Sequence, residues 1–263
     1  MELRQVALEV ARILQDAGKH ALNDQMNPRD LKSFEMTDNH LSFTSDIDKR
    51  LAQFISNRIT YVDVFDGFWQ FRPEECHPGE RYWCVGGIDG AINFVRSMPE
   101  WTITVSLFEF NDQCSAQPIL SVVHAPALGL TYLAVRGAIR IRKTPLGDKR
   151  EKIMPSTTPS LDYAVVSFGM SHVPEESKRA LEVVSRISGR PADIKRVGPS
   201  SLDLCKVADG TYDAYFEAHL HKWDVPAVSA GAVVVWEAQG HLSRWNGDLV
   251  HWRRKTTYSP PTV

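Results

Sequence analysis

Residues 196–224 read RVGPSSLDLCKVADGTYDAYFEAHLHKWD, and the fold assignment depends most on this stretch. It predicts a helix over SSLDLCKVA, a strand over TYDAYFEA and, after Asp224, a helix over VPAVSAGAVVVWEA. The preceding residues continue the alternation, with a strand over LDYAVVSF, a helix over EESKRALEVVSRI and a strand over ADIKRV. Strands that alternate with helices indicate an open sheet covered on both faces, so we expect an α/β fold.

The first half of the chain has a different pattern. Apolar residues spaced three and four apart predict a helix at its start, and a second helix begins near Asp46. Residues 23–39, between them, are polar and predict a loop. Residues 101–107 alternate between apolar and hydroxyl side chains, which predicts a half-buried strand. The runs PILSVVH and LTYLAVR follow, and residues 125–129 between them indicate a hairpin.

The charged segment RIRKTPLGDKREK, residues 140–152, separates the two patterns and is the predicted boundary. We therefore divide the chain into an N-terminal α+β half, residues 1–145, and a C-terminal α/β half, residues 146–263. The last residues, TTYSPPTV, are typical of a loose tail.

The composition is that of an ordinary globular protein of 263 residues. The formal net charge of -2 is unlike the basic surface of a nucleic-acid binder, so we expect no nucleic-acid partner. The four cysteines form no CxxC pair, which favours free thiols in a reducing compartment. Charges interrupt the first helix, and no uncharged apolar run reaches about 18 residues. We therefore expect neither a signal peptide nor a membrane contact, and a cytoplasmic location.

Acidic residues stand at the start of three predicted helices. In WCVGGIDGAINF, residues 83–94, a strand-like run enters a Gly-Gly turn, Asp89 follows, and a short helix begins near Gly90. Backbone amides at such a helix start can hold a phosphate. Asp224 heads a Gly/Ala-rich helix, and Asp46 and Asp48 open the helix after Thr44. Taken singly, each acid is explained as a helix cap or a favourable first-turn charge.

In this order and at these separations, the three segments resemble the inositol monophosphatase family. Ser45-Asp46-Ile47-Asp48 matches the family's Thr-x-x-Asp, residues 86–94 match its Asp-Pro-Ile/Leu-Asp-Gly-Thr-x-Asn-Phe loop, and Trp223-Asp224 matches its late Trp-Asp. The resemblance covers roughly residues 1–250. It implies a layered αβαβα sandwich, usually a homodimer, in which carboxylates gather magnesium ions around a substrate phosphate.

The resemblance also implies roles for single residues. Asp89 and Asp224 correspond to metal ligands, the carbonyl of Ile88 faces a metal, and Asp48 helps to hold the attacking water or a metal. Asp48, Asp89 and Asp224 are therefore the candidate catalytic residues. The candidate substrate-binding residues comprise the phosphate-binding amides, the polyol pocket and an acid for a substrate hydroxyl: Gly90, Ala91, Ile92, Gly198, Pro199, Ser200 and Glu217.

The chain departs from the family at the metal loop. The carboxylate that bridges two metals in the family is replaced by Gly86, and its Pro neighbour by Gly87. The Thr that orients the attacking water is Ala91, which has no hydroxyl. Without a shared carboxylate, two dications side by side are strongly unfavourable. We therefore expect Mg²⁺ at one weakened site made of Asp89 and Asp224, or no metal at all.

The Glu-Glu pair of the family has no clean counterpart. Glu74-Glu75 is the nearest match, which makes Glu75 the remaining candidate metal ligand, and Glu80 is a poorer one. The loop between this pair and residue 86 is short for the family.

Three functions remain open. The favoured one is a diverged member that binds or acts on a small phosphorylated or sugar-like metabolite, with the usual phosphatase chemistry lost or strongly reduced. In that case His219 or His221 joins the three aspartates as a candidate for acid/base work. The second is an active magnesium phosphomonoesterase on inositol or sugar phosphates, in which Glu74 or Glu75 supplies the missing carboxylate. The third is a non-catalytic binding or regulatory subunit.

Overall fold

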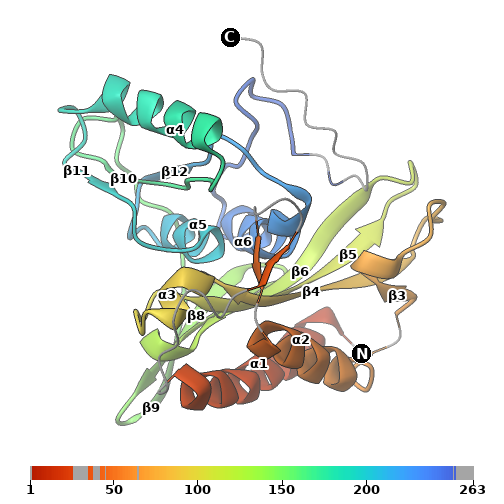
Figure 1. Cartoon of the computed structure of the whole chain (residues 1–263). Coiled ribbons are helices and arrows are strands. Elements are labelled where there is room, and N and C mark those ends of the chain that lie inside the picture. Colours follow the sequence, from red (N-terminus) through yellow and green to blue (C-terminus); the bar gives the residue numbers. More distant parts are fainter. Residues whose placement is uncertain are drawn as a thin grey trace.

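The computed structural model describes residues 2–25, 35–37, 42–44, 46–63, 65–250 and 252. From the bottom to the top of Figure 1, the elements form five layers: two helices, a large sheet, two helices, a small sheet and one helix. This order confirms the predicted α/β class and the αβαβα sandwich. None of the described helices combines the length and the apolar character needed to cross a membrane.

The first layer consists of helices α1 (Leu3–Gln25) and α2 (Asp46–Ile59), which pack on one face of the large sheet. Both helices were predicted, because their apolar side chains recur on one stripe and are buried in the core under the sheet. Of the predicted loop, residues 23–25 belong to α1, and residues 35–37 form strand β1, which pairs with β2 (Ser42–Thr44). The rest of that prediction and the predicted tail lie outside the described residues.

The second layer is a seven-stranded sheet in which the strands follow one another in chain order. All neighbouring strands are antiparallel except the first pair. The hairpin predicted around residues 125–129 is confirmed, with a short 3-10 helix η3 (Pro126–Leu128) in the connection. The strands are β3 (Gly67–Phe68), β4 (Arg81–Asp89), β5 (Thr102–Phe110), β6 (Ala116–Ala125), β7 (Leu130–Ala134), β8 (Ala138–Thr144) and β9 (Gly147–Lys152).

The interior strand β5 is buried on both faces, so the prediction of a half-buried strand was wrong. Its hydroxyl side chains do not reach water, because α5 and α6 cover that face of the sheet. Thr102 and Ser106 instead exchange hydrogen bonds with Ser201 and Ser229, at 2.6 and 2.7 Å between the hydroxyl oxygens. A hydroxyl face therefore does not indicate an exposed face where a helix supplies polar partners.

The upper three layers follow the pattern predicted from residues 161–238. Two helices lie on the large sheet, a three-stranded parallel sheet of order β11-β10-β12 lies above them, and one helix covers the top (Figure 1). These elements are α5 (Ser200–Ala208), α6 (Val225–Glu237), β10 (Val165–Phe168), β11 (Asp193–Lys195), β12 (Ala214–Phe216) and α4 (Pro174–Ile187).

The predicted boundary segment is a β-hairpin of the large sheet. Residues of β8 pair with β9 from Ile139 opposite Lys152 to Thr144 opposite Gly147. The charged side chains of residues 140–152 therefore belong to strand β8 and to the exposed edge strand β9. The large sheet ends at Lys152, and the division at residue 145 remains a prediction.

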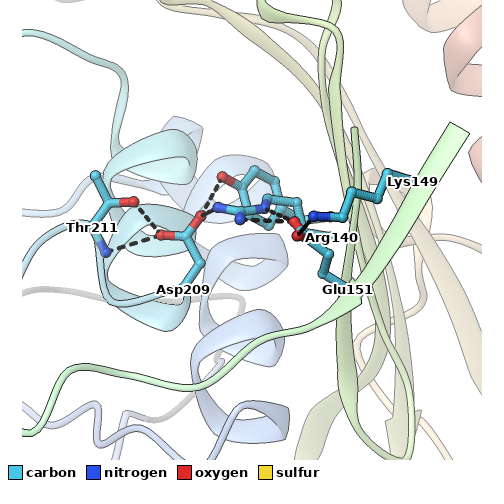
Figure 2. Close-up of polar contacts among 6 residues, drawn as sticks. Arg140, Lys149, Glu151, Asp209 and Thr211 are labelled. Atoms are coloured by element: carbon cyan, nitrogen blue, oxygen red, sulfur yellow. Dashed lines mark hydrogen bonds and ion pairs between the residues drawn. The ribbon is translucent and has the colours of Figure 1, made fainter. Parts of the chain in front are cut away.

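An ion-pair network joins this hairpin to the upper layers. Figure 2 shows Arg140 of β8 between Glu151 of β9 and Asp209, which directly follows α5. Asp209 also accepts hydrogen bonds from Tyr132 and Thr211. Its side chain is 1% exposed, so Arg140 compensates a buried charge between the sheet and α5.

Candidate functional site

A cavity of about 260 Å³ opens between the large sheet, the starts of α5 and α6, and the small sheet. One side is formed by the end of β4 and the short helix α3 (Ala91–Val95). The opposite side is formed by residues 196–200, before and at the start of α5, and by residues 215–224, which lead into α6. Residues 169–172, after β10, complete the wall. The cavity thus gathers segments from both halves of the chain.

The structure brings most of the predicted site residues together around this cavity. Of the candidate catalytic and metal-binding residues, Ile88, Asp89 and Asp224 line it. All predicted substrate-binding residues line it as well: Gly90, Ala91, Ile92, Gly198, Pro199, Ser200 and Glu217. Their roles remain predictions.

Asp89 ends β4 and is held by the first turn of α5. Its Oδ2 atom accepts hydrogen bonds from the Ser201 amide at 3.1 Å and from the Ser201 hydroxyl at 2.5 Å. Burial raises the pKa of Asp89, and the two Ser201 donors oppose this shift. One carboxylate oxygen of Asp89 is therefore used to hold the start of a helix.

Glu217 and Asp224 form the acidic part of the opposite side. Glu217 accepts a hydrogen bond from the Tyr215 hydroxyl at 2.6 Å, and Asp224 accepts one from the His221 amide at 2.7 Å. Burial raises the pKa of both carboxyls, and the negative charge of Asp224 raises that of Glu217 further. This side of the cavity therefore favours protonated carboxyls or a ligand that supplies positive charge or hydrogen-bond donors.

The two candidate histidines also line the cavity. His221 lies 2.9 Å from a Glu176 carboxylate oxygen and stacks on Trp223, with ring centroids 4.3 Å apart. His219 lies 3.5 Å from the other Glu176 oxygen. Helix α4 thus supplies an acid that fixes both imidazoles at the rim.

Sequence reasoning missed several residues of this site. Tyr215 lies two residues before Glu217, and side chains two residues apart in extended backbone point to the same face. Their contact could therefore have been predicted from the sequence. Arg196 lines the cavity and its guanidinium lies 3.4 Å from the Gly198 carbonyl oxygen. No local sequence signal pointed to Glu176, which comes from a different layer.

Asp48 does not line the cavity. It is buried on α2, where its Oδ1 atom accepts a hydrogen bond from the Ile88 amide at 2.6 Å. The acid thus lies behind β4 and fixes the backbone of the residue whose carbonyl was predicted to face a metal.

The structure also gives the predicted Glu-Glu counterparts no place in the cavity wall. Glu74 and Glu75 are exposed, and neither belongs to the residues that line the cavity. Glu80 accepts hydrogen bonds from the His77 amide and the Tyr82 hydroxyl, both at 3.0 Å. The short loop before β4 keeps these acids near the sheet edge, so Glu75 is not brought to Asp89.

The predicted Gly-Gly turn was also wrong. Gly86 and Gly87 lie inside β4, at a β-bulge between Val85 and Ile88. The change of direction comes later, at Gly90, whose φ of 90° is in the left-handed region. The sequence placed the glycines correctly in the loop motif but could not distinguish a bulge from a turn.

The residues present do not fit the pair of magnesium ions that the resemblance implies. In the part of the chain that the structure describes, no three His, Cys, Asp or Glu side chains are placed to hold a metal ion together. Magnesium demands oxygen ligands in near-octahedral geometry. One oxygen of Asp89 accepts from Ser201, and Gly86 has no side chain to offer.

Comparison with known proteins decides the relationship. Residues 2–261 match the model of the inositol monophosphatase family. The chain belongs to this family. Solved structures of inositol monophosphatase-type proteins share the fold: the Thermotoga maritima IMPase has a TM-score of 0.72 at 23% identity, covering 91% of this chain and 85% of its own. SuhB from Bartonella henselae has a TM-score of 0.73 at 21% identity, covering 94% and 89%.

Curated relatives of this inositol monophosphatase-family chain have several names. The Nus factor SuhB of Xylella fastidiosa is 31% identical over 63% of this chain and 55% of the relative. The inositol-1-monophosphatase of Rhizobium meliloti is 28% identical over 78% and 72%. The histidinol-phosphatase of Streptomyces coelicolor is 27% identical over 91% and 87%. The chain spans 55 to 60% of the length of the SuhB relatives from Xylella and Neisseria.

Proposed function

We propose that this chain is a diverged inositol monophosphatase-like protein that binds or acts on a small phosphorylated or polyol metabolite in the cavity. Metal-assisted phosphate hydrolysis is lost or strongly reduced. The observation that carries the proposal is the bonding of Asp89: one oxygen of this candidate metal ligand accepts two hydrogen bonds from Ser201, and residue 86 has no carboxylate.

The physical argument concerns charge. Two dications close together repel each other and need a shared anionic ligand between them. Residue 86 supplies no such ligand, and Ala91 has no hydroxyl to position a water. Loss of one positioned group typically costs about 10²–10³ in rate in other enzymes, and two such losses together leave little hydrolysis.

Retention of the opposite side supports metabolite binding. Glu217 and residues 198–200 line the cavity where the family resemblance places a polyol, and residues 90–92 line it where the resemblance places the phosphate. The polar lining and the volume of about 260 Å³ suit a small polar ligand.

The first alternative is an active magnesium phosphomonoesterase. The names of the Rhizobium and Streptomyces relatives, an inositol-1-monophosphatase and a histidinol-phosphatase, favour it. Under this alternative Asp89 and Asp224 bind one magnesium ion, and the remaining ligands are waters and substrate oxygens.

The second alternative is a non-catalytic binding or regulatory subunit. The name Nus factor, given to the SuhB relatives, favours it. Under each alternative we propose a homodimer, on the family resemblance, and a cytoplasmic location, on the sequence pattern.

The test separates hydrolysis from binding. The whole chain is assayed for phosphate release from a panel of inositol, sugar and amino-alcohol phosphates with millimolar magnesium or manganese, beside the Asp89→Asn variant. We expect no metal-dependent release above that of the variant. The same metabolites are then screened for a rise in melting temperature in EDTA, where we expect at least one to stabilise the protein.

Metal-dependent turnover that Asp89→Asn abolishes would establish the phosphomonoesterase. If there is neither turnover nor stabilisation by any metabolite, the cavity is not a metabolite site, and the regulatory alternative is favoured.

A further inference from the structure

The β-bulge in β4 places two glycines opposite one residue of β5. Val85 pairs with Val105 and Ile88 pairs with Ile103, so Gly86 and Gly87 together face Thr104. Thr104 is buried, and its hydroxyl has no hydrogen-bond partner among the described residues. Packing, rather than a hydrogen bond, therefore fixes this side chain against the bulge.

The space beside Gly86 is filled. A Cβ atom built on Gly86 would lie 2.3 Å from Thr104 Oγ1, 3.2 Å from Pro226 Cβ and 3.3 Å from the Thr104 carbonyl oxygen. The first distance is far shorter than a contact between non-bonded atoms. Gly86 is not among the glycines with positive φ, so its backbone accepts a side chain. Crowding alone excludes one.

The neighbouring glycine is crowded from the other face of the sheet. A Cβ atom on Gly87 would lie 2.8 Å from Asp48 Oδ1 and 3.3 Å from Asp48 Cβ. Asp48 is held there by the Ile88 amide, at 2.6 Å. Residues of α2, β5 and α6 therefore pack directly against the backbone of the bulge, where the two glycines have no side chains.

We propose that neighbouring side chains fill the space that a bridging carboxylate at residue 86 would need. Thr104 is the main steric obstacle to restoring that carboxylate. The acid is not merely absent: Thr104 and Pro226 occupy the volume in which its side chain would begin. Restoring Asp at residue 86 therefore does not by itself restore metal binding, whereas restoring it together with a smaller residue at 104 does. This inference rests on the proposed function, because it explains why the metal pair is lost.

A double-mutant cycle tests the packing without any metal. Gly86→Ala adds only the Cβ atom, and Thr104→Ala removes the nearest atom. We expect Gly86→Ala to lower the urea midpoint of the wild type clearly and to lower that of Thr104→Ala much less. Thr104→Val is the matched control, because it keeps the volume, and we expect Gly86→Ala to remain as harmful there. Equal effects of Gly86→Ala in all three backgrounds would overturn the proposal.

Metal binding tests the consequence. Mn²⁺ affinity is measured by electron paramagnetic resonance for the wild type, Gly86→Asp, Gly86→Asp with Thr104→Ala, and Gly86→Asp with Thr104→Val. We expect Mn²⁺ to bind about tenfold or more tightly only in the Thr104→Ala combination, a change that corresponds to about 1.4 kcal/mol.

Gly86→Asp alone binding as tightly as that combination would overturn the proposal, and so would no gain in the combination. Two tightly bound ions in the wild type would instead refute the proposed function itself. If Gly86→Asp fails to fold, the alanine cycle still decides.

Discussion

The two sides of the cavity differ in how many of the family's motif residues they retain. The ligand wall, which we define as residues 196–201 and 215–224, presents every family counterpart predicted for it, including Glu217 and Asp224. The loop wall, which we define as residues 88–93, has alanine in place of the water-orienting hydroxyl, and it follows Gly86, which stands in place of the bridging acid. The comparison teaches that the departures from the family motif gather in the loop wall, and we propose that they affect the metal chemistry and spare the metabolite site.

The two walls also bond differently to the rest of the protein. In the ligand wall, Glu217 and Asp224 are held by close neighbours along the chain, Tyr215 and His221. In the loop wall, Asp89 is held by Ser201 and the Ile88 amide by Asp48, so distant elements converge on it. A change in the loop wall therefore requires compensation in several layers.

The largest expected effect concerns the attachment of the ligand wall to the sheet. Arg140→Met leaves the Asp209 carboxylate, 1% exposed, without its ion partner (Figure 2). Loss of one partner of a buried pair costs about 3–5 kcal/mol, and we expect urea denaturation to show a loss in that range. Lys149→Met is the matched control in the same network. Lys149 is 64% exposed, and its removal should cost about 1 kcal/mol or less. Equal losses would mean that Asp209 is not buried in solution.

The second effect is a pH dependence of the unfolding free energy that originates in the ligand wall. Burial raises the pKa of Glu217 from 4.5 to about 8, so the folded state holds this proton more tightly than the unfolded state. The stabilisation is complete below about pH 4.5 and is lost as the pH rises toward 8. Glu217→Gln should reduce the fall in unfolding free energy over this range by a few kcal/mol, at most about 5 kcal/mol. A residual slope from Asp224 should remain, because burial raises its pKa as well.

The control for this measurement is Glu182→Gln, at an exposed residue of α4. We expect its stability to follow the wild-type pH dependence. An unchanged slope in Glu217→Gln would show that the carboxyl is solvated and that the ligand wall is open to water.

The third effect concerns the packing of α6 on α5 behind the ligand wall. A Cβ atom on Gly231 would lie 2.6 Å from Leu204 Cδ1. Gly231→Ala gains about 1 kcal/mol from helix propensity, but overpacking typically costs about 1–3 kcal/mol, so we expect a net loss in thermal unfolding. In a Leu204→Ala background the same change should cost less but still destabilise, because Leu204 Cβ, which alanine keeps, would lie 2.7 Å from the new atom. A net gain in the wild type would mean that the two helices separate at little cost.

The smallest expected loss of stability comes from the contact between the two walls. Ser201→Ala removes the hydroxyl that donates to Asp89 and meets Thr102, while the amide donor to Asp89 remains. We expect a loss of about 1 kcal/mol in urea denaturation. Ser200→Ala, the neighbouring change, should have less effect, and the reverse order would contradict the assignment of Ser201 as the partner of Asp89.

The sequence predicted the layers and most of the ligand wall, because alternating strands and helices and the motif spacing are local signals. The predictions failed where tertiary contacts decide. The hydroxyl face of β5 is buried since Ser201 and Ser229 supply partners from other elements. The glycines at 86 and 87 lie in a bulge against which Thr104 and Asp48 pack closely, and neither is near in sequence. The place of Glu75 depended on the path of a loop with no periodic pattern.

The central claim is that no pair of divalent ions is held beside Asp89, and counting bound ions tests it most directly. The wild-type protein, stripped of metal, is titrated with Mn²⁺, and the bound ions per chain are determined by electron paramagnetic resonance. We predict at most one weakly bound ion per chain. Two tightly bound ions per chain, one of them lost in Asp89→Asn, would contradict the account.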